Sequence, residues 1–129
     1  MDVKSLLNVS ASGMQAQRAR TEAIASNLAN ANVTRTEDGT PYQRRVPVFE
    51  MSADSSMVEV TDIEKVKSFR KEYDPTHPHA DDDGYVLRPD IDIMTEMVDL
   101  MESVRSYEAN ANVVDVTKEL VSRALAIGK

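Results

Sequence analysis

The chain has 129 residues and a formal net charge of −7, with 15 Lys and Arg against 22 Asp and Glu. It contains no Cys, which excludes disulfide frameworks, thiolate nucleophiles and Cys-based zinc sites, and its acidic balance argues against nucleic-acid binding. No stretch approaches the roughly 20 consecutive apolar residues that a membrane span needs. Aromatic residues make up only 5% of the chain, so we expect a hydrophobic core that is thin or shared with other chains.

The first 31 residues predict one long helix, because they contain no Pro and a single Gly and are rich in Ala. Their apolar residues fall on two seven-residue ladders that polar residues interrupt. One ladder consists of Leu7, Met14, Thr21 and Leu28, and the other of Val3, Ser10, Gln17, Ile24 and Ala31. This pattern predicts a weak coiled-coil seam in a helix that is marginally stable alone.

The composition changes between residues 32 and 90, where all five Pro lie. Pro and Gly at this density predict loops and short strands. The strand candidates are residues 42–49, 57–60 and 65–73, and Pro47 restricts the first of them to a sheet edge. We expect an irregular loop at residues 74–84.

Residues 90–128 are free of Pro and predict a second long helix that ends at Gly128. At about 1.5 Å per residue the two helices would reach roughly 45 and 55 Å, longer than a domain of this size is wide. We therefore expect something beyond one monomer to cover them. Met94, Met97 and Met101 form a stripe on this helix, which fits an adaptable recognition surface as well as it fits ordinary helix core.

Candidate sites for chemistry are weak. His77, His79 and Asp81–Asp83 form the one cluster that resembles a metal site, but an EF-hand alignment lacks Asp at position 1 and Glu at position 12, so we predict a solvated acidic turn. The chain has no Gly-flanked nucleophile elbow and no Gly-rich phosphate loop, and we expect neither catalysis nor a cofactor. The basic groups Arg44–Arg45 and Lys65, Lys67, Arg70 and Lys71 predict solvated strand faces or partners for acidic neighbours.

Three Asn lie within six residues at the end of the first helix, where one would be enough to stop it. The segment Asn27, Leu28, Ala29 and Asn30, followed by Thr34, resembles the signature of the bacterial flagellar rod and hook proteins. The segments YDPTHPHAD (73–81), GYV (84–86), EMV (96–98) and RSYEAN (105–110) are similar to the proximal rod proteins among them. This resemblance covers nearly the whole chain.

The resemblance implies a mainly α fold with a small β or irregular insert, in which the terminal helices form an antiparallel coiled-coil hairpin. The implied parts are a tube-forming N-terminal helix (1–31), a small outward-facing domain (32–90) and a tube-forming C-terminal helix (91–129). It implies a structural subunit that passes uncleaved through the flagellar type III export pathway and assembles helically as periplasmic rod. Its implied partners are copies of itself, other rod proteins, and a FliE-type adaptor, membrane ring and export gate at the base.

Our hypothesis is that the helices bury their apolar stripes against each other and against adjacent subunits, giving a torque-transmitting tube. The expected interface residues are Val3, Leu7, Met14, Ile24, Leu28, Met94, Met97, Met101, Val104, Val114, Val121 and Leu125. Asn27 and Asn30 are expected to cap the helix or to bond between subunits. The alternative is a soluble coiled-coil adaptor or export cofactor that never polymerises.

Overall fold

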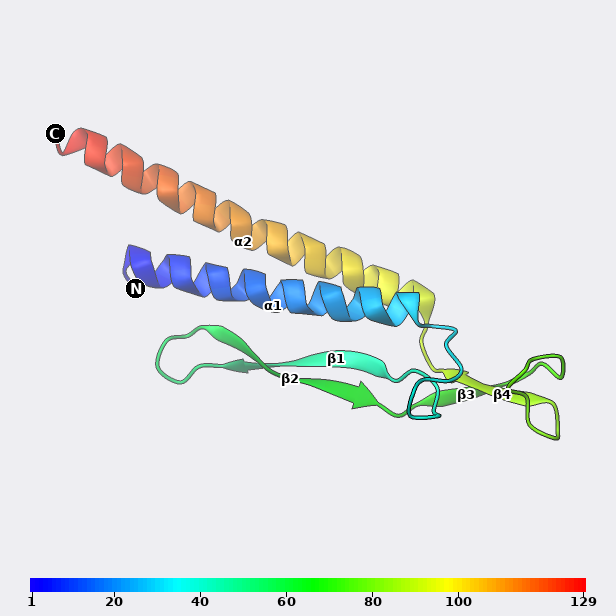
Figure 1. The fold of residues 1–129 in the computed structure, drawn as a ribbon. Coiled ribbons are helices and arrows are strands. Elements are labelled where there is room, and N and C mark those ends of the chain that lie inside the picture. The colour runs from blue at the N-terminus through cyan, green and yellow to red at the C-terminus, as the bar shows by residue number, and fades with distance from the viewer.

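The computed structural model describes residues 1–129 and contains two long helices and two β-hairpins (Figure 1). Their order along the chain is α1 (Val3–Ala29), β1 (Arg44–Met51), β2 (Val58–Val66), β3 (Phe69–Tyr73), β4 (Tyr85–Pro89) and α2 (Ile93–Ile127). The helices run antiparallel, α1 lies between α2 and the β1–β2 hairpin, and the β3–β4 hairpin projects beyond the helix ends (Figure 1). The predicted fold class is thus confirmed: two long terminal helices in contact, with a small β region between them in sequence.

Side-chain caps fix where the helices begin. Asp2 precedes α1, and its Oδ1 accepts a hydrogen bond from the backbone N–H of Ser5 at 2.7 Å. Asp92 does the same for α2, accepting from the N–H groups of Met94 and Thr95 at 2.9 and 3.2 Å. Because Asp92 is the cap, α2 begins at Ile93 rather than at residue 90 as predicted. It ends before Gly128, as predicted.

The β region differs from the prediction in two ways. Residues 65–73 are not one strand: β2 ends at Val66 and β3 starts at Phe69, because the chain turns where the N–H of Ser68 bonds back to the carbonyl of Val66 at 3.0 Å. The two strands belong to separate antiparallel hairpins, β1–β2 and β3–β4. Strand β4 was not predicted, and its Val86 is among the most buried apolar side chains.

The core is thin, as the composition predicts. Only 16 of 129 residues are buried, and the largest fully buried side chains include those of Glu96, Asn27 and Ser103. The accessible surface is 8975 Å², whereas a compact monomer of 14.3 kDa would expose about 6,800 Å². The elongated chain therefore exposes considerably more surface to solvent than a compact monomer of the same mass. Neither long helix has the run of apolar residues that crossing a membrane requires.

Candidate functional site

Polar and small residues line the contact between α1 and α2. Thr21 Oγ1 and Ser103 Oγ share a hydrogen bond of 3.0 Å across it, and Arg20 Nη2 lies 3.4 Å from Glu102 Oε2. Further along, Gly13 lets the helices approach closely, since a Cβ there would lie 3.0 Å from Nδ2 of Asn110. We call this contact the polar seam. It uses specific pairings rather than a broad apolar stripe.

The polar seam ends at a buried junction around Asn27, which is completely inaccessible to solvent. Asn27 Nδ2 donates to the carbonyl of Arg45 at 2.9 Å and to Glu96 Oε2 at 3.2 Å. Asn27 Oδ1 accepts from Tyr42 Oη at 3.0 Å and from the N–H of Arg45 at 2.8 Å. An amide has two donor hydrogens and two acceptor lone pairs, and all four are used inside the chain.

The partners of Asn27 come from β1, from α2 and from the loop before β1, so the junction joins α1, the start of β1 and the start of α2. Glu96, only 1% exposed, forms an ion pair with Arg44 Nε through its second carboxylate oxygen. Ser26 Oγ lies 2.9 Å from Tyr42 Oη and completes the network. A buried carboxylate is tolerated only when it is paired and hydrogen-bonded in this way. We call Asn27, Tyr42, Arg44 and Glu96 the polar junction.

The structure gives the other signature residues separate places. Asn30 caps the end of α1, with its Nδ2 donating to the carbonyl of Ser26 at 2.8 Å. Leu28 is half-buried and Ala29 is exposed. Thr34 Oγ1 lies 2.9 Å from His79 Nδ1, linking the loop after α1 to the β3–β4 loop. Asn27 itself does not cap the helix, and its amide has no group left for a second subunit.

The expected interface residues divide between the inside and the outside of the chain. Ile24 is buried, and five residues are half-buried: Leu7, Met14, Leu28, Val114 and Val121. The others are exposed: Val3, Met94, Met97, Met101, Val104 and Leu125. The methionine stripe is therefore not core within this chain.

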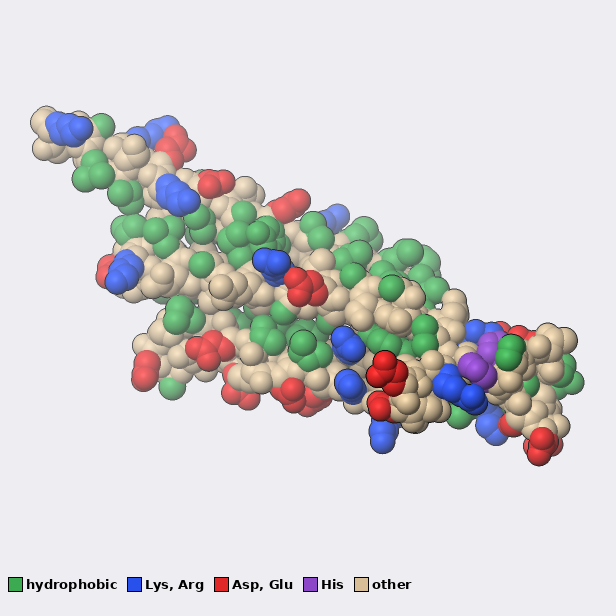
Figure 2. Space-filling model, in the orientation of Figure 1, with side chains coloured by type: hydrophobic (Ala, Val, Ile, Leu, Met, Phe, Trp, Pro, Cys, Tyr) green, Lys and Arg blue, Asp and Glu red, His purple; other side chains and the backbone are tan.

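Met94, Met97, Val98, Met101 and Val104 recur at helical spacing on the outside of α2, and we call them the Met face. All five are more than 40% exposed, and apolar side chains gather along the outer side of α2 (Figure 2). The helix thus directs its polar ladder of Glu96, Ser103, Asn110 and Thr117 inward and its methionines outward. The sequence reasoning missed this polar ladder, although its seven-residue spacing was the signal for it.

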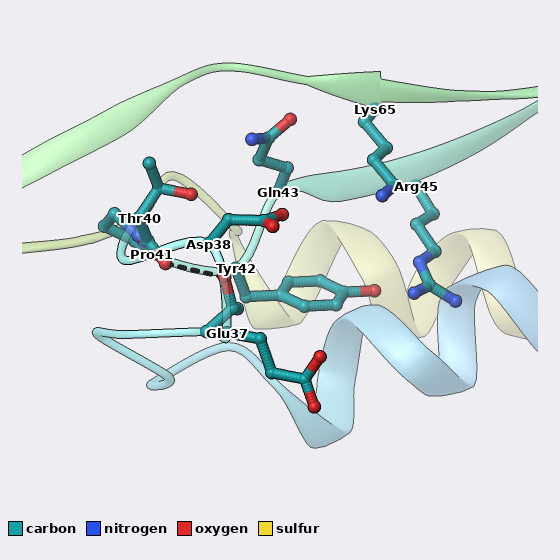
Figure 3. A pocket seen from close by; sticks show the side chains of 9 residues that line it. Glu37, Asp38, Thr40, Pro41, Tyr42, Gln43, Arg45 and Lys65 are labelled. Carbon is teal, nitrogen blue, oxygen red and sulfur yellow. Dashed lines mark hydrogen bonds between the residues drawn. The ribbon is translucent and has the colours of Figure 1, made fainter.

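A shallow cleft lies between the loop of residues 36–43 and the β1–β2 hairpin (Figure 3). Glu37 and Asp38 contribute acidic side chains, while Arg45 and Lys65 contribute basic ones. Small-molecule sites are mostly apolar with a few polar groups, and this lining is the reverse. The cleft therefore has the character of a charged protein surface.

The histidine cluster is more dispersed than a metal site requires. The backbone N–H of His79 donates to His77 Nδ1 at 3.0 Å. Asp81 Oδ1 accepts from the backbone N–H groups of Asp83 and Tyr85 at 3.0 and 2.8 Å. No three His, Asp or Glu side chains gather in a metal-binding arrangement. Partial loss of water around the ring, and then the charges of Arg35 and His77, lower the pKa of His79 below its usual 6.5.

This architecture, with a signature Asn at a helix junction and apolar faces directed outward, agrees with the class of flagellar rod proteins. Two family models match the chain: one described as flagella basal body rod protein over residues 7–35, and one described as flagellar basal body rod FlgEFG protein C-terminal over residues 82–127. The chain is a structural rod protein of the flagellar basal body.

Whole-chain relatives identify the particular family. The chain is 45% identical to the flagellar basal-body rod protein FlgC of Aquifex aeolicus, in an alignment covering 100% of this chain and 99% of the relative. It is 39% identical to FlgC of Bacillus subtilis over 95% of this chain and 96% of the relative. It is 36% identical to FlgC of Borreliella burgdorferi over 98% of each. The chain belongs to the FlgC family.

Proposed function

We propose that this chain is a subunit of the proximal rod that assembles through the exposed apolar faces of α1 and α2, with copies of itself and with other rod proteins as neighbours. On this proposal the two helices form the wall of the tube and the β-hairpins lie outside it. Export through the flagellar type III pathway precedes assembly, and a FliE-type adaptor, the membrane ring and the export gate lie at the base. The assembled helices carry torque toward the distal rod and hook.

The Met face is the observation that carries this proposal. Met94, Met97 and Met101 are 71%, 47% and 56% exposed on the outside of a helix whose inner side is polar. Burying a Met, Val or Leu side chain contributes about 1.5–3 kcal/mol, and this gain is not realised in the single chain. Exposed apolar surface of this extent marks a protein interface, and membership of a rod family supplies the partner subunits.

The test is the double variant Met97→Asp and Met101→Asp in cells that lack the natural chain. Because both side chains are exposed in the single chain, we expect the free energy of unfolding of the purified protein to fall by only about 1 kcal/mol, which the lower helix propensity of Asp accounts for. We expect basal bodies without a rod, seen by electron microscopy, and loss of swimming. Placing charge in an assembled apolar interface is costly because it loses water without gaining a partner.

The matched control is Met97→Leu and Met101→Leu, which keeps the apolar area and should assemble rods. Complete rods in the Asp variant would contradict the proposal. Intact rods in cells that lack the chain altogether would contradict membership of the rod itself. A stable purified Asp variant without rods separates an assembly defect from a folding defect.

A further inference from the structure

The β1–β2 hairpin is a two-stranded sheet in which neither strand has a further strand on its outer edge. Strand β2 pairs only with β1, and every residue of β2 after Val58 is exposed. The hairpin lies along the side of α1 that faces away from α2 (Figure 1). A long, exposed edge strand invites contact with another chain unless its charges prevent that contact.

The charges on this hairpin are strongly segregated. Residues 46–64 carry five acidic side chains and no basic one, and we call these the acidic hairpin: Glu50, Asp54, Glu59, Asp62 and Glu64. The next seven residues carry four basic side chains and no acidic one, and we call these the basic segment: Lys65, Lys67, Arg70 and Lys71. Acidic side chains follow the outer edge of the hairpin, with basic ones further along the molecule (Figure 2).

None of these nine charges has an ion-pair partner within the chain, although eight ion-pair contacts form elsewhere. All nine side chains are exposed. The two groups adjoin in the sequence at Glu64 and Lys65, but their outer members lie far apart. Glu59, near the start of β2, and Lys67, just past the end of β2 at Val66, are eight residues apart, which corresponds to about 26 Å of extended chain.

Each hairpin also places like charges opposite one another. Glu50 faces Glu59 across β1 and β2, and Arg70 faces Arg88 across β3 and β4. Like charges in directly opposed positions destabilise a sheet. Arg88 is compensated by Glu72 at 2.9 Å and by Asp74 at 3.8 Å, whereas Glu50, Glu59 and Arg70 are not.

We propose that the acidic hairpin of one copy contacts the basic segment of a second copy, so that neighbouring subunits are joined head to tail along the outside of the helices. This rests on the proposed function and adds a second, electrostatic contact to the apolar one. The two surfaces are complementary in sign and displaced along the molecule, so the contact is heterologous. Repeated contacts of that kind build a ring where the rotation closes and an open helical assembly where it does not. Pairing two copies through the same acidic edge is disfavoured by repulsion.

Cross-linking tests the contact directly, because the chain has no Cys of its own. The variant Glu59→Cys with Lys67→Cys is expressed in place of the natural chain, and purified basal bodies are oxidised. We expect disulfide-linked dimers and higher multimers. A disulfide needs Cα atoms within about 7 Å, so the two positions of one chain cannot react together, and each single-Cys variant should give no dimer.

Charge reversal gives an independent readout. Glu59→Lys with Asp62→Lys, and Lys67→Glu with Lys71→Glu, are each expected to lose rod assembly and swimming, whereas the combined four-residue swap should restore both. The control Asp82→Lys with Asp83→Lys reverses exposed charges in the β3–β4 loop and should swim normally.

The outcomes separate the two proposals. Rods that contain the chain but show no cross-link, with charge-reversed variants that still assemble, would overturn the inference and leave the proposed function standing. Cross-linked bands that contain a different rod protein would overturn the choice of a second copy. Absence of the chain from purified basal bodies would overturn both.

Discussion

Asn27 shows why a family signature can contain more Asn than a helix end needs. An Asn placed one residue later on the helix would point its amide away from Glu96. An Asp at position 27 would lack the two donor hydrogens that the carbonyl of Arg45 and the carboxylate of Glu96 accept. The sequence indicated that this cluster of Asn was unusual, but we expected Asn27 to cap the helix or to bond between subunits. Its partners lie 15, 18 and 69 residues away, and no local pattern reports such contacts.

We predict that Asn27→Ala lowers the free energy of unfolding by about 3 kcal/mol, because it leaves several buried polar groups without partners. Urea unfolding followed by circular dichroism measures this. Asn32→Ala is the control, because Asn32 is exposed and its side chain makes no hydrogen bond, and it should change stability by less than about 0.5 kcal/mol. Equal effects from the two substitutions would refute the structural role of the junction.

His79 gives a pH prediction. Its pKa is lowered in the fold by partial desolvation and by Arg35 and His77. The unfolded chain therefore takes up the proton first as pH falls, so His79 reduces folding stability progressively below about pH 6.5. A histidine titration by NMR should place the pKa of His79 below 6.5, and Arg35→Gln should raise it part of the way back, because desolvation is the larger cause. A pKa above 6.5 in the natural chain would contradict this.

Among the elements, the positions of the two helices were predictable from the sequence. Which residues of each helix face the other helix was not. The Pro-free runs and the closing Gly128 are local signals, and they located α1 and α2 to within about three residues. Apolar periodicity suggested that Met97 and Met101 face inward as readily as outward. The inner side of α2 is instead polar: Ser103 shares a hydrogen bond with Thr21 of α1, and Asn110 lies against Gly13 while its amide bonds to Ser106 within α2.

The close approach at Gly13 makes a prediction about this seam. Gly13→Leu should lower the melting temperature despite the better helix propensity of Leu, because its Cβ alone would already lie 3.0 Å from Asn110. Ala11→Leu is the control at an exposed position of the same helix, and it should leave the melting temperature nearly unchanged, because Ala and Leu are both strong helix formers. Adding Asn110→Ala to the Gly13 variant should recover part of the loss, and no recovery would show that the clash lies elsewhere.

The strands were predicted less well than the helices, for a physical reason. Residues 65–73 alternate like one strand, but the turn at Ser68 divides them between two hairpins. Strand β4 is short and follows a loop rich in Asp and Pro, so no period was long enough to detect it. Pairing partners decide where a strand ends, and pairing is not a local property.

At the scale of the whole molecule, the elongated shape follows from the composition. Few aromatic anchors and a polar seam leave only 16 buried residues, and the apolar residues that remain lie outside. The sequence predicted helices too long for a single domain to cover, and the surface of 8975 Å² agrees with that. Which exposed residue meets which neighbour depends on a second chain, and the sequence of one chain contains that information only as complementary patches.

The C-terminal end of α2 extends past the start of α1 (Figure 1). There Leu125 and Ile127 are 66% and 85% exposed. We predict that Leu125→Asp with Ile127→Asp leaves the unfolding of the purified chain unchanged, because nothing in the chain covers these residues, but prevents rod formation. Sedimentation of basal-body fractions and urea unfolding measure the two effects. The variant Leu125→Met with Ile127→Met is the control, and rods in the Asp variant would show that this end lies free.

The polar seam also fixes how far the helices can slide along each other. A slip of one heptad, about 10 Å, would break the Thr21–Ser103 and Asn27–Glu96 hydrogen bonds together. It would also move Asn110 away from Gly13 to a position on α1 that carries a side chain. An apolar stripe would tolerate such a slip, because one Leu contact resembles the next. The helix pair therefore has one register in which all of these contacts form together.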